Sequence, residues 1–482
     1  MRAWLRRMTG SYSRGVTGGR CEVPSASSSG DGAPLACAAR GAHRNRAADV
    51  GATCESRCKP RLTALFTSLA VLAFAHSTAF ADVLIRNARV HTITSTGTLE
   101  RADVLVRGRT IAAVGANLAA PAGIPVVDAA GRELTPGIFG GLSDIGLTEV
   151  SLESSTDDSS VADTMPLHEM QLRPEFDPTP LFNPRSVTVP VARVAGITWT
   201  MLTPGRPSRG GGTFLTGQAS AVSLSGDFGA ALPGTRTLFI DLTRDTGPLA
   251  GGSRASQFML LEQAVREART TGAPGDKDLL HAAGREALRR YLAGGRVVFQ
   301  VDRAVDIREV IAFSQRNGIK PVIVGGVEAW VVANDLAKAK VPVVLDPFAN
   351  LPADFDRIGA RLDNAALLNR AGVRIAFMLR EDSSTRAKRI RQAAGNAAAH
   401  GLSRDVALEA ITSAPADIFG VTSRGRIAQG QAADLVLWTG DPLEVTTLAT
   451  NVWIAGQPMP MTSRQTELRD RYLEKLRSQQ AR

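Results

Sequence analysis

The sequence predicts an α/β protein in which a (β/α)8 barrel carries a small composite β-sandwich formed by the N- and C-terminal segments. The length of 482 residues and the hydrophobic content of 44% are enough to bury a large core. Strand-like apolar runs alternate with helical patterns through the middle of the chain, which indicates parallel strands joined by crossover helices. A doubly wound open sheet is the alternative, but no Gly-x-Gly-x-x-Gly follows the first strand to support it.

Two β-rich segments, 82–135 and 424–460, are expected to form the sandwich together. Strands are predicted in them at 83–85, 90–93, 104–106, 111–114, 433–438 and 452–456. Turn residues separate these runs, and the economical arrangement is one sandwich built from both segments. Residues 461–482 are predicted to form a charged helical tail.

Residues 136–423 are assigned to the barrel. Its strand-like runs lie at 197–202, 237–242, 296–301, 321–324, 341–345 and 373–379. Helical stretches between the later runs lie at 306–317, 328–339 and 364–370. A long segment rich in Asp, Ser and Pro, 151–190, follows the first barrel strand, and such loops commonly build the rim of an active site.

Positive charge is concentrated in the first 81 residues. The net charge is +10, and residues 1–81 hold eleven Lys or Arg against four Asp or Glu. A basic leader therefore explains most of the excess, and no nucleic-acid partner is expected. Residues 1–58 lack periodicity and are interpreted as a start site assigned too far upstream or as a disordered extension. They contain all four cysteines: Cys21, Cys37, Cys54 and Cys58.

Residues 59–81 have the pattern of a signal peptide. Lys59 and Arg61 precede the apolar run 62–75, and Ala79-Phe80-Ala81 follows as an Ala-x-Ala cleavage site. A membrane anchor is the competing interpretation, but a span needs about 20 apolar residues and this run is shorter. No Cys follows the run, which argues against a lipoprotein. We expect cleavage after Ala81 and a periplasmic protein without an integral membrane anchor or cysteines.

Three groups of motifs resemble one protein family. Val126-Val127-Asp128-Ala129-Ala130-Gly131 leads into Thr135-Pro136-Gly137. Asp306-Ile307-Arg308 and Val327-Glu328-Ala329 follow two predicted strands. Ala410-Ile411-Thr412-Ser413-Ala414-Pro415-Ala416 precedes Gly430-Gln431-Ala432-Ala433-Asp434-Leu435-Val436 and Gly440-Asp441-Pro442-Leu443, and this is the most specific combination. Together they resemble the imidazolonepropionase-like branch of the amidohydrolase superfamily.

The resemblance implies a metal-assisted attack of water on a C–N bond, with ligands at the carboxyl ends of the barrel strands. In the family a His-x-His pair follows Pro-Gly in the first strand. Here Leu142 and Asp144 stand at the two histidine positions, Gln300 at the fifth-strand histidine and Gly325 at the sixth. Leu and Gly offer no metal-binding atom, and Gln is a weak ligand. Zinc is implied by the family alone, and no metal or other cofactor is expected.

Other residues offer limited compensation. The histidines after residue 81 lack partners at ligand spacing and are interpreted as ordinary polar residues: His91, His168, His281 and His400. The family's strand-eight aspartate falls near Arg380-Glu381-Asp382, where the three residues compete for the position. The catalytic candidates are therefore Asp144, Asp302, Glu381 and Asp382, and the binding candidates at the barrel mouth are Gln300, Glu328 and Arg380.

Two interpretations of these carboxylates stay open. They could form an oxygen-only site for Mg²⁺ or Ca²⁺, which prefer oxygen ligands. The alternative, which we favour, is that they are solvated or ion-paired with Arg303, Arg308 and Arg380.

Three functions follow from different classes. The favoured one is an exported, non-catalytic partner or scaffold of an active relative, bound to a related amidohydrolase subunit or to a second copy of itself. The second is a hydrolase of small amides, dipeptides or cyclic ureides that uses an altered carboxylate site. The third is a small-molecule binding protein. Metal content separates the second function from the others, and co-purification with a relative separates the first from the third.

Overall fold

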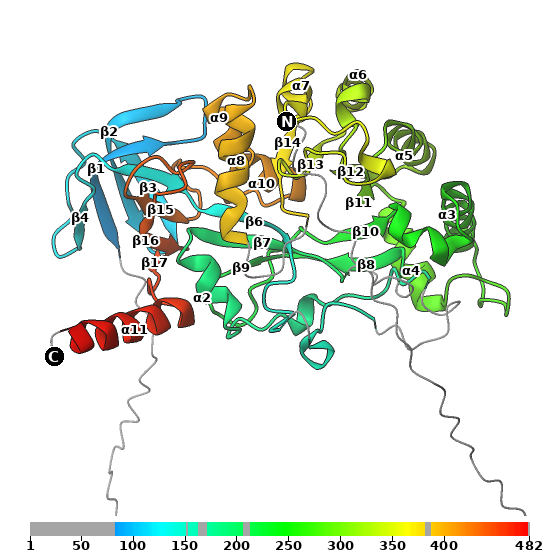
Figure 1. Ribbon diagram of the computed structural model, residues 1–482, viewed down its shortest axis with the longest axis horizontal. Helices are drawn as coiled ribbons and strands as arrows, with labels where there is room; N and C mark the ends of the chain where they lie inside the picture. The colour runs from blue at the N-terminus through cyan, green and yellow to red at the C-terminus, as the bar shows by residue number, and fades with distance from the viewer. Residues whose placement is uncertain (1–81, 151–152, 162–170, 206–212, 381–386, 481–482) are drawn as a thin grey trace, which may run out of the picture. The chain divides into compact units, whose positions relative to one another are not determined.

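The computed structural model describes residues 82–150, 153–161, 171–205, 213–380 and 387–480. The chain divides into two compact units, and all of these residues belong to the second, His76–Arg482. The predictions for the leader and the signal peptide therefore fall outside the described residues. The described part is an α/β fold with three sheets (Figure 1). Within it, no helix has the combined length and apolar character needed to cross a membrane.

The eight-stranded sheet joins the two ends of the described chain. Its order is β17-β16-β15-β5-β1-β2-β3, with β4 paired to β1. The antiparallel pair of β5 with β15 sets Leu134 opposite Leu437, and both side chains are buried in one apolar cluster. Burial of this shared face holds the two ends together. The strands are β1 (Val83–His91), β2 (Thr98–Arg107), β3 (Thr110–Gly115), β4 (Val126–Asp128), β5 (Glu133–Pro136), β15 (Leu435–Trp438), β16 (Ala449–Ile454) and β17 (Gln457–Pro458).

Strand β1 is continuous where the sequence predicts two strands, at 83–85 and 90–93. Its pairing with β2 shifts register between Ile85 and Ala88, and Asn87 has a φ of 54°. The Asn87 N–H donates to Asp103 Oδ1 at 2.9 Å. The polar residues between the two apolar runs therefore form a β-bulge inside one strand, which local hydrophobicity does not reveal.

Parallel strands carry the middle of the chain. In the six-stranded sheet β10 to β14 pair in sequence order, and β8 joins the edge antiparallel to β10. Their side chains are almost entirely buried, as expected for parallel strands covered on both faces. The strands are β8 (Leu215–Ala219), β10 (Thr237–Asp241), β11 (Arg296–Val301), β12 (Lys320–Gly325), β13 (Val343–Leu345) and β14 (Ile375–Phe377).

Helices connect these strands and follow them. The α-helices are α2 (Thr188–Arg193), α3 (Arg254–Arg269), α4 (Ala282–Tyr291), α5 (Ala304–Asn317), α6 (Ala333–Ala339), α7 (Asn364–Arg370), α8 (Ile390–Ala399), α9 (Arg404–Glu409), α10 (Ser413–Phe419) and α11 (Arg464–Gln480). The 3₁₀ helices are η1 (Ser154–Thr156), η2 (Thr179–Leu181), η3 (Arg244–Ala250), η4 (Ala329–Val332), η5 (Phe355–Arg357) and η6 (Ala387–Arg389).

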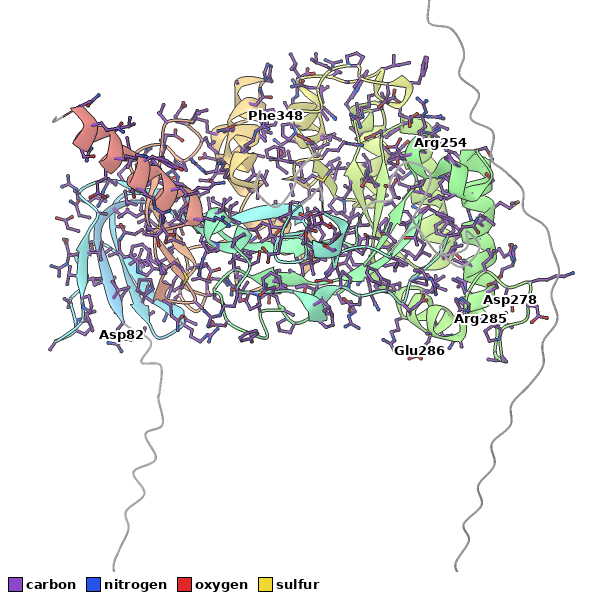
Figure 2. The ribbon with its side chains drawn as sticks, turned by 60° about the horizontal axis from the view of Figure 1, so that its bottom comes forward. Asp82, Arg254, Asp278, Arg285, Glu286 and Phe348 are labelled. Atoms are coloured by element: carbon purple, nitrogen blue, oxygen red, sulfur yellow. The ribbon has the colours of Figure 1, made fainter. Side chains whose placement is uncertain are left out.

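Helix α5 illustrates how these helices are fixed. Ile307 and Val310 recur at helical spacing and are fully buried. Gly318 ends the helix with a φ of 69°, a left-handed conformation that suits glycine. Arg254, labelled in Figure 2, is the first residue of α3. It ties α3 to α5, because its Nε lies 3.0 Å from Asp306 Oδ2, and it also pairs with Asp356.

The predicted closed (β/α)8 barrel is not formed as one continuous ring of strands in the described residues. β6 (Ile138–Ser143), β7 (Ile197–Leu202) and β9 (Ala221–Ser223) make a separate three-stranded sheet. Ser220 alone separates β8 from β9 in the chain, and these two strands pair antiparallel with β10 and β7. One extended segment therefore bridges the two sheets where a barrel would pair parallel strands.

A second bridge links β6 to β14. The backbone carbonyl of Ile411 accepts a hydrogen bond from the Phe139 N–H at 2.8 Å, and that of Ala410 accepts one from the Phe377 N–H at 3.0 Å. Residues 410 and 411 therefore lie between the two strands, which are linked through them and do not pair with each other directly. The α/β class is confirmed, and in the described residues these two irregular segments join the sheets, while the closed eightfold ring stays a prediction.

Candidate functional site

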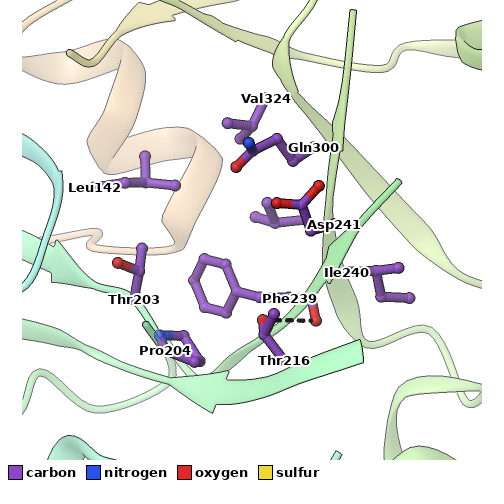
Figure 3. A pocket seen from close by; sticks show the side chains of 10 residues that line it. Leu142, Thr203, Pro204, Thr216, Phe239, Ile240, Asp241, Gln300 and Val324 are labelled. Atoms are coloured by element: carbon purple, nitrogen blue, oxygen red, sulfur yellow. Dashed lines mark hydrogen bonds between the residues drawn. The ribbon is translucent and has the colours of Figure 1, made fainter. Parts of the chain in front are cut away.

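Positions that the resemblance assigns to metal ligands meet at one small cavity (Figure 3). Leu142 of β6 lies on one side, facing Asp241 of β10, Gln300 of β11 and Val324 of β12. All four residues lie near the carboxyl ends of their strands. The cavity volume is about 40 Å³. The strand ends thus converge as they do around a barrel site, and the lining combines apolar side chains with the polar side chains of Thr203, Thr216, Asp241 and Gln300.

Asp241 is a cavity residue that the sequence analysis did not single out. Its Oδ1 accepts hydrogen bonds from the Thr243 N–H at 2.9 Å and the Thr243 hydroxyl at 2.6 Å. The residue is 6% exposed, so these bonds hold the carboxylate in place at the end of β10. The sequence feature that could have identified Asp241 is a carboxylate near the end of the apolar run 237–242, because barrel strands present functional groups at their carboxyl ends.

An ion pair occupies the space beside Gly325, the sixth-strand histidine position. Arg380 follows β14, Asp302 follows β11, and the Arg380 guanidinium pairs with the Asp302 carboxylate. Their side chains are 7% and 4% exposed. A Cβ atom at Gly325 would lie 2.5 Å from Arg380 Nη2 and 2.6 Å from Asp302 Oδ1. The pair therefore fills the volume into which a side chain at position 325 would project.

Strand register explains why these groups meet. Val301 pairs with Gly325, Gly325 with Leu345, and Leu345 with Phe377, so four strands end at one level. The residues just beyond those ends then form a network. Asp346 Oδ2 accepts a hydrogen bond from the Arg380 N–H at 2.7 Å, and Arg357 Nε lies 3.9 Å from Asp302 Oδ2. Two arginines and two aspartates are thus held at the carboxyl edge of the sheet.

The remaining candidates have other surroundings. Asp144 is partly buried after β6, and its backbone carbonyl accepts hydrogen bonds from the N–H groups of Leu147 and Thr148. Glu328 Oε2 accepts a hydrogen bond from the N–H of Ala304, the first residue of α5, at 3.0 Å. Its carboxylate therefore stabilises a helix N-terminus. Glu381 and Asp382 lie outside the described residues.

The three arginines expected to pair with the candidate carboxylates each pair with a different acidic residue. Arg380 pairs with the candidate Asp302. Arg303 lies 3.4 Å from Asp306, and Arg308 lies 3.4 Å from Asp335, and neither acid is a candidate site residue. Burial raises the pKa of Asp306, against the opposing effect of Arg303 and Arg254.

Comparisons with known proteins agree with this architecture. Residues 370–460 match the model of the amidohydrolase family. Amidohydrolase tasK of Hapsidospora irregularis is 45% identical over 58 residues, which are 12% of this chain and only 6% of that protein. The structure of an amidohydrolase from Thermotoga maritima MSB8 has a TM-score of 0.65 at 24% identity, covering 79% of this chain and 100% of that chain.

The family match is thus confined to residues 370–460, and the likeness to the solved structure shows a shared fold. The fold likeness extends over most of the described residues, while the family model covers the C-terminal region that includes Arg380 and strands β14 to β17. The imidazolonepropionase-like branch stays a prediction.

The zinc ion that the amidohydrolase superfamily implies does not fit the side chains present at these positions. Leu142 and Gly325 have no donor atom, and Gln300 offers a neutral amide. Across the described residues, no group of three or more His, Cys, Asp or Glu side chains is placed to hold a metal ion.

The histidines have structural surroundings instead. His91 Nε2 lies 2.6 Å from Glu133 Oε2 in the eight-stranded sheet. His400 Nδ1 lies 2.8 Å from the carbonyl oxygen of Asn396, and His281 precedes α4. His168 lies outside the described residues.

Proposed function

We propose that this chain is a non-catalytic member of the amidohydrolase superfamily that acts as the partner of an active relative, without zinc of its own. The observation that carries the proposal is the ion pair of Arg380 with Asp302 beside Gly325. A guanidinium group supplies fixed positive charge, but it offers no open coordination position at which water could be activated. The chain thereby keeps the scaffold and loses the family's source of a nucleophile.

The small cavity supports the same proposal. Its volume of about 40 Å³ is far below the roughly 300–1,000 Å³ of pockets that bind small organic molecules. Leu142 lines it at a position where the resemblance places a metal-binding histidine. The cavity therefore favours neither hydrolysis of a small amide nor recognition of a small molecule at this end of the sheet.

An exposed apolar segment supports a protein partner. The chain between β13 and α7 exposes several large apolar side chains, and their exposed fractions range from 47% to 79%: Leu351, Phe355, Ile358 and Leu362. Clustered apolar residues on a surface commonly mark a protein interface. The segment follows the carboxyl end of β13, which is the end of the sheet at which the candidate site lies. We infer that the partner is a related amidohydrolase subunit, with a second copy of this chain as the alternative.

Elemental analysis and an amidase assay test the loss of catalysis. We expect zinc, magnesium and calcium each well below one ion per chain, and no turnover of small amides, dipeptides or cyclic ureides. A relative that keeps His-x-His serves as the positive control. Stoichiometric metal together with amidase activity that Asp302→Asn or Asp241→Asn abolishes would establish instead the hydrolase with an altered carboxylate site.

Co-expression with a His-x-His-bearing relative from the same organism tests the partnership. We expect a stable complex on size-exclusion chromatography, weakened at least about tenfold by Phe355→Ser with Ile358→Ser, because buried aromatic anchors dominate interfaces. Phe228→Ser is the matched control, since Phe228 and Phe355 are both 79% exposed. A chain that stays monomeric beside the relative contradicts the proposal, and a homodimer sensitive to the same changes supports self-association.

Export is part of the proposal and rests on residues 59–81. A basic start, an apolar run and Ala79-Phe80-Ala81 support cleavage after Ala81 and a periplasmic location. N-terminal sequencing of the accumulated protein is expected to begin at Asp82. A first residue before position 62 would contradict it.

A further inference from the structure

The amino ends of the parallel strands form a second cavity, at the opposite end of the sheet from the candidate site. Its volume is about 480 Å³. Arg296 and Lys320 are the first residues of β11 and β12, and Pro342 and Arg374 directly precede β13 and β14. The strand register that places Asp302, Gly325 and Arg380 together at one end of the sheet therefore places these residues together at the other end.

The charge of this cavity is one-sided. Four cationic side chains line it, Arg296, Lys320, Lys340 and Arg374, against the single carboxylate of Asp417. That carboxylate is already shared, because Arg374 pairs with Asp417 Oδ2 and Arg426 Nη2 donates to the same oxygen at 2.7 Å. Asp417 therefore leaves the charges of the other lining cations uncompensated.

The three other cations have no acidic partner among the described residues. Lys320 and Lys340 are exposed at the rim and form no ion pair there. Arg296 is partly buried, and its Nη1 hydrogen-bonds only weakly to Thr237 Oγ1, at 3.4 Å. Burial lowers the pKa of Arg296, so the protein holds this charge at an energetic cost that an anion would relieve.

The cations lie around apolar walls. Pro321, Pro342 and Ile418 contribute to the lining. The Arg296 side chain packs against Gly420, because a Cβ atom added at Gly420 would lie 2.7 Å from Arg296 Nη2. Lys340 ends α6 with a φ of 55°, which fixes the direction of its backbone. Cationic side chains beside apolar walls suit an organic molecule that carries negatively charged groups.

We propose that this cavity binds a small organic anion carrying at least two negative charges, as phosphate or carboxylate groups. The volume falls within the range of roughly 300–1,000 Å³ that is usual for small-molecule sites. The site is independent of the proposed loss of catalysis, because it uses none of the residues at the carboxyl ends of the strands. It gives the chain a ligand site on the face that barrels normally use for stability.

Isothermal titration calorimetry of the full chain with inorganic pyrophosphate and with citrate tests the site. We expect saturable binding of one anion per chain, weakened about tenfold by Lys320→Gln with Lys340→Gln, since each partly exposed charge contributes modestly. Lys277→Gln with Lys475→Gln removes the same net charge at two exposed lysines outside the cavity, and it should leave the affinity unchanged.

Three outcomes would overturn the proposal. The first is no saturable binding of either anion to the unaltered chain. The second is an equal loss of affinity in both double variants, which would show that net charge alone attracts the anion. The third is binding that Lys320→Gln with Lys340→Gln leaves unchanged, which would place the anion elsewhere.

Discussion

Gly325 combines a backbone conformation and a surrounding space that suit only glycine. Its φ of 94° is one that other residues rarely adopt, and the Arg380 guanidinium and Asp302 carboxylate fill the volume beside its Cα. A histidine at this position would therefore be opposed twice, by backbone strain and by the ion pair.

Replacing Gly325 by alanine should destabilise the protein for both reasons. A left-handed conformation costs a residue with Cβ roughly 1–2 kcal/mol. The contact with the ion pair adds roughly 1–3 kcal/mol of overpacking. Gly123→Ala isolates the first effect, since Gly123 has a φ of 80° and open space around its Cβ position. Urea denaturation compares the two variants, and equal losses of unfolding free energy would mean that Arg380 and Asp302 move aside without cost.

Part of the site could be predicted from single residues. Leu142, Gln300 and Gly325 follow from the family resemblance, which places a histidine at each of these positions, and Leu142 and Gln300 do line one cavity. The partnership of Arg380 with Asp302 could not be predicted, because the two residues lie 78 positions apart and only strand register brings them together. Asp241 was not predicted, because the resemblance as quoted assigns no ligand to the apolar run 237–242.

At the scale of helices and strands, the sequence pattern predicts the elements whose bounds depend on neighbouring residues in the chain. The strand run 296–301 and the helical stretch 364–370 match β11 and α7, since apolar periodicity and turn residues mark their ends. The β1 bulge and the antiparallel β8–β9 segment depend on pairing with distant strands. The pairing of β5 with β15 could be predicted. Both ends of the chain carry strand patterns, and neither end alone can bury its apolar strand face.

Helix α11 should be dispensable for folding. It has no buried residue in the structure, and its apolar side chains Tyr472 and Leu476 are 60% and 53% exposed. Ending the chain after Ser463 should therefore change the thermal midpoint by less than about 2 °C. Ending it after Ala455 removes β17 and the buried Met459 as well, and should cost clearly more. Differential scanning calorimetry distinguishes these results, and a large loss from the shorter deletion would reveal packing by α11.

At the scale of the whole molecule, Arg391 ties the helices around the parallel strands to the composite sheet. It lies in α8, and its guanidinium donates to the carbonyl oxygens of Pro442 at 2.6 Å and Thr447 at 3.0 Å, in the segment after β15. It also lies 4.5 Å from the ring centroid of Trp438, a buried residue of β15. Burial lowers the pKa of Arg391 to about 10, so this charge is held largely away from water.

Arg391→Ala should weaken this connection. The change leaves two carbonyl groups without their donor and removes the contact with the Trp438 ring, for a net loss of roughly 2–4 kcal/mol in unfolding free energy. The unfolding free energy of Arg391→Lys should lie between those of the unaltered protein and Arg391→Ala, because a point charge cannot stack on the ring and reach both carbonyls as a planar guanidinium does. Arg370→Ala is the control, since Arg370 is exposed at the end of α7 and should change stability by less than about 0.5 kcal/mol. Urea unfolding followed by tryptophan fluorescence measures all three variants. If Arg391→Ala unfolds at the same urea concentration as Arg370→Ala, the apolar contacts between the parts are sufficient by themselves and the arginine is not their tie.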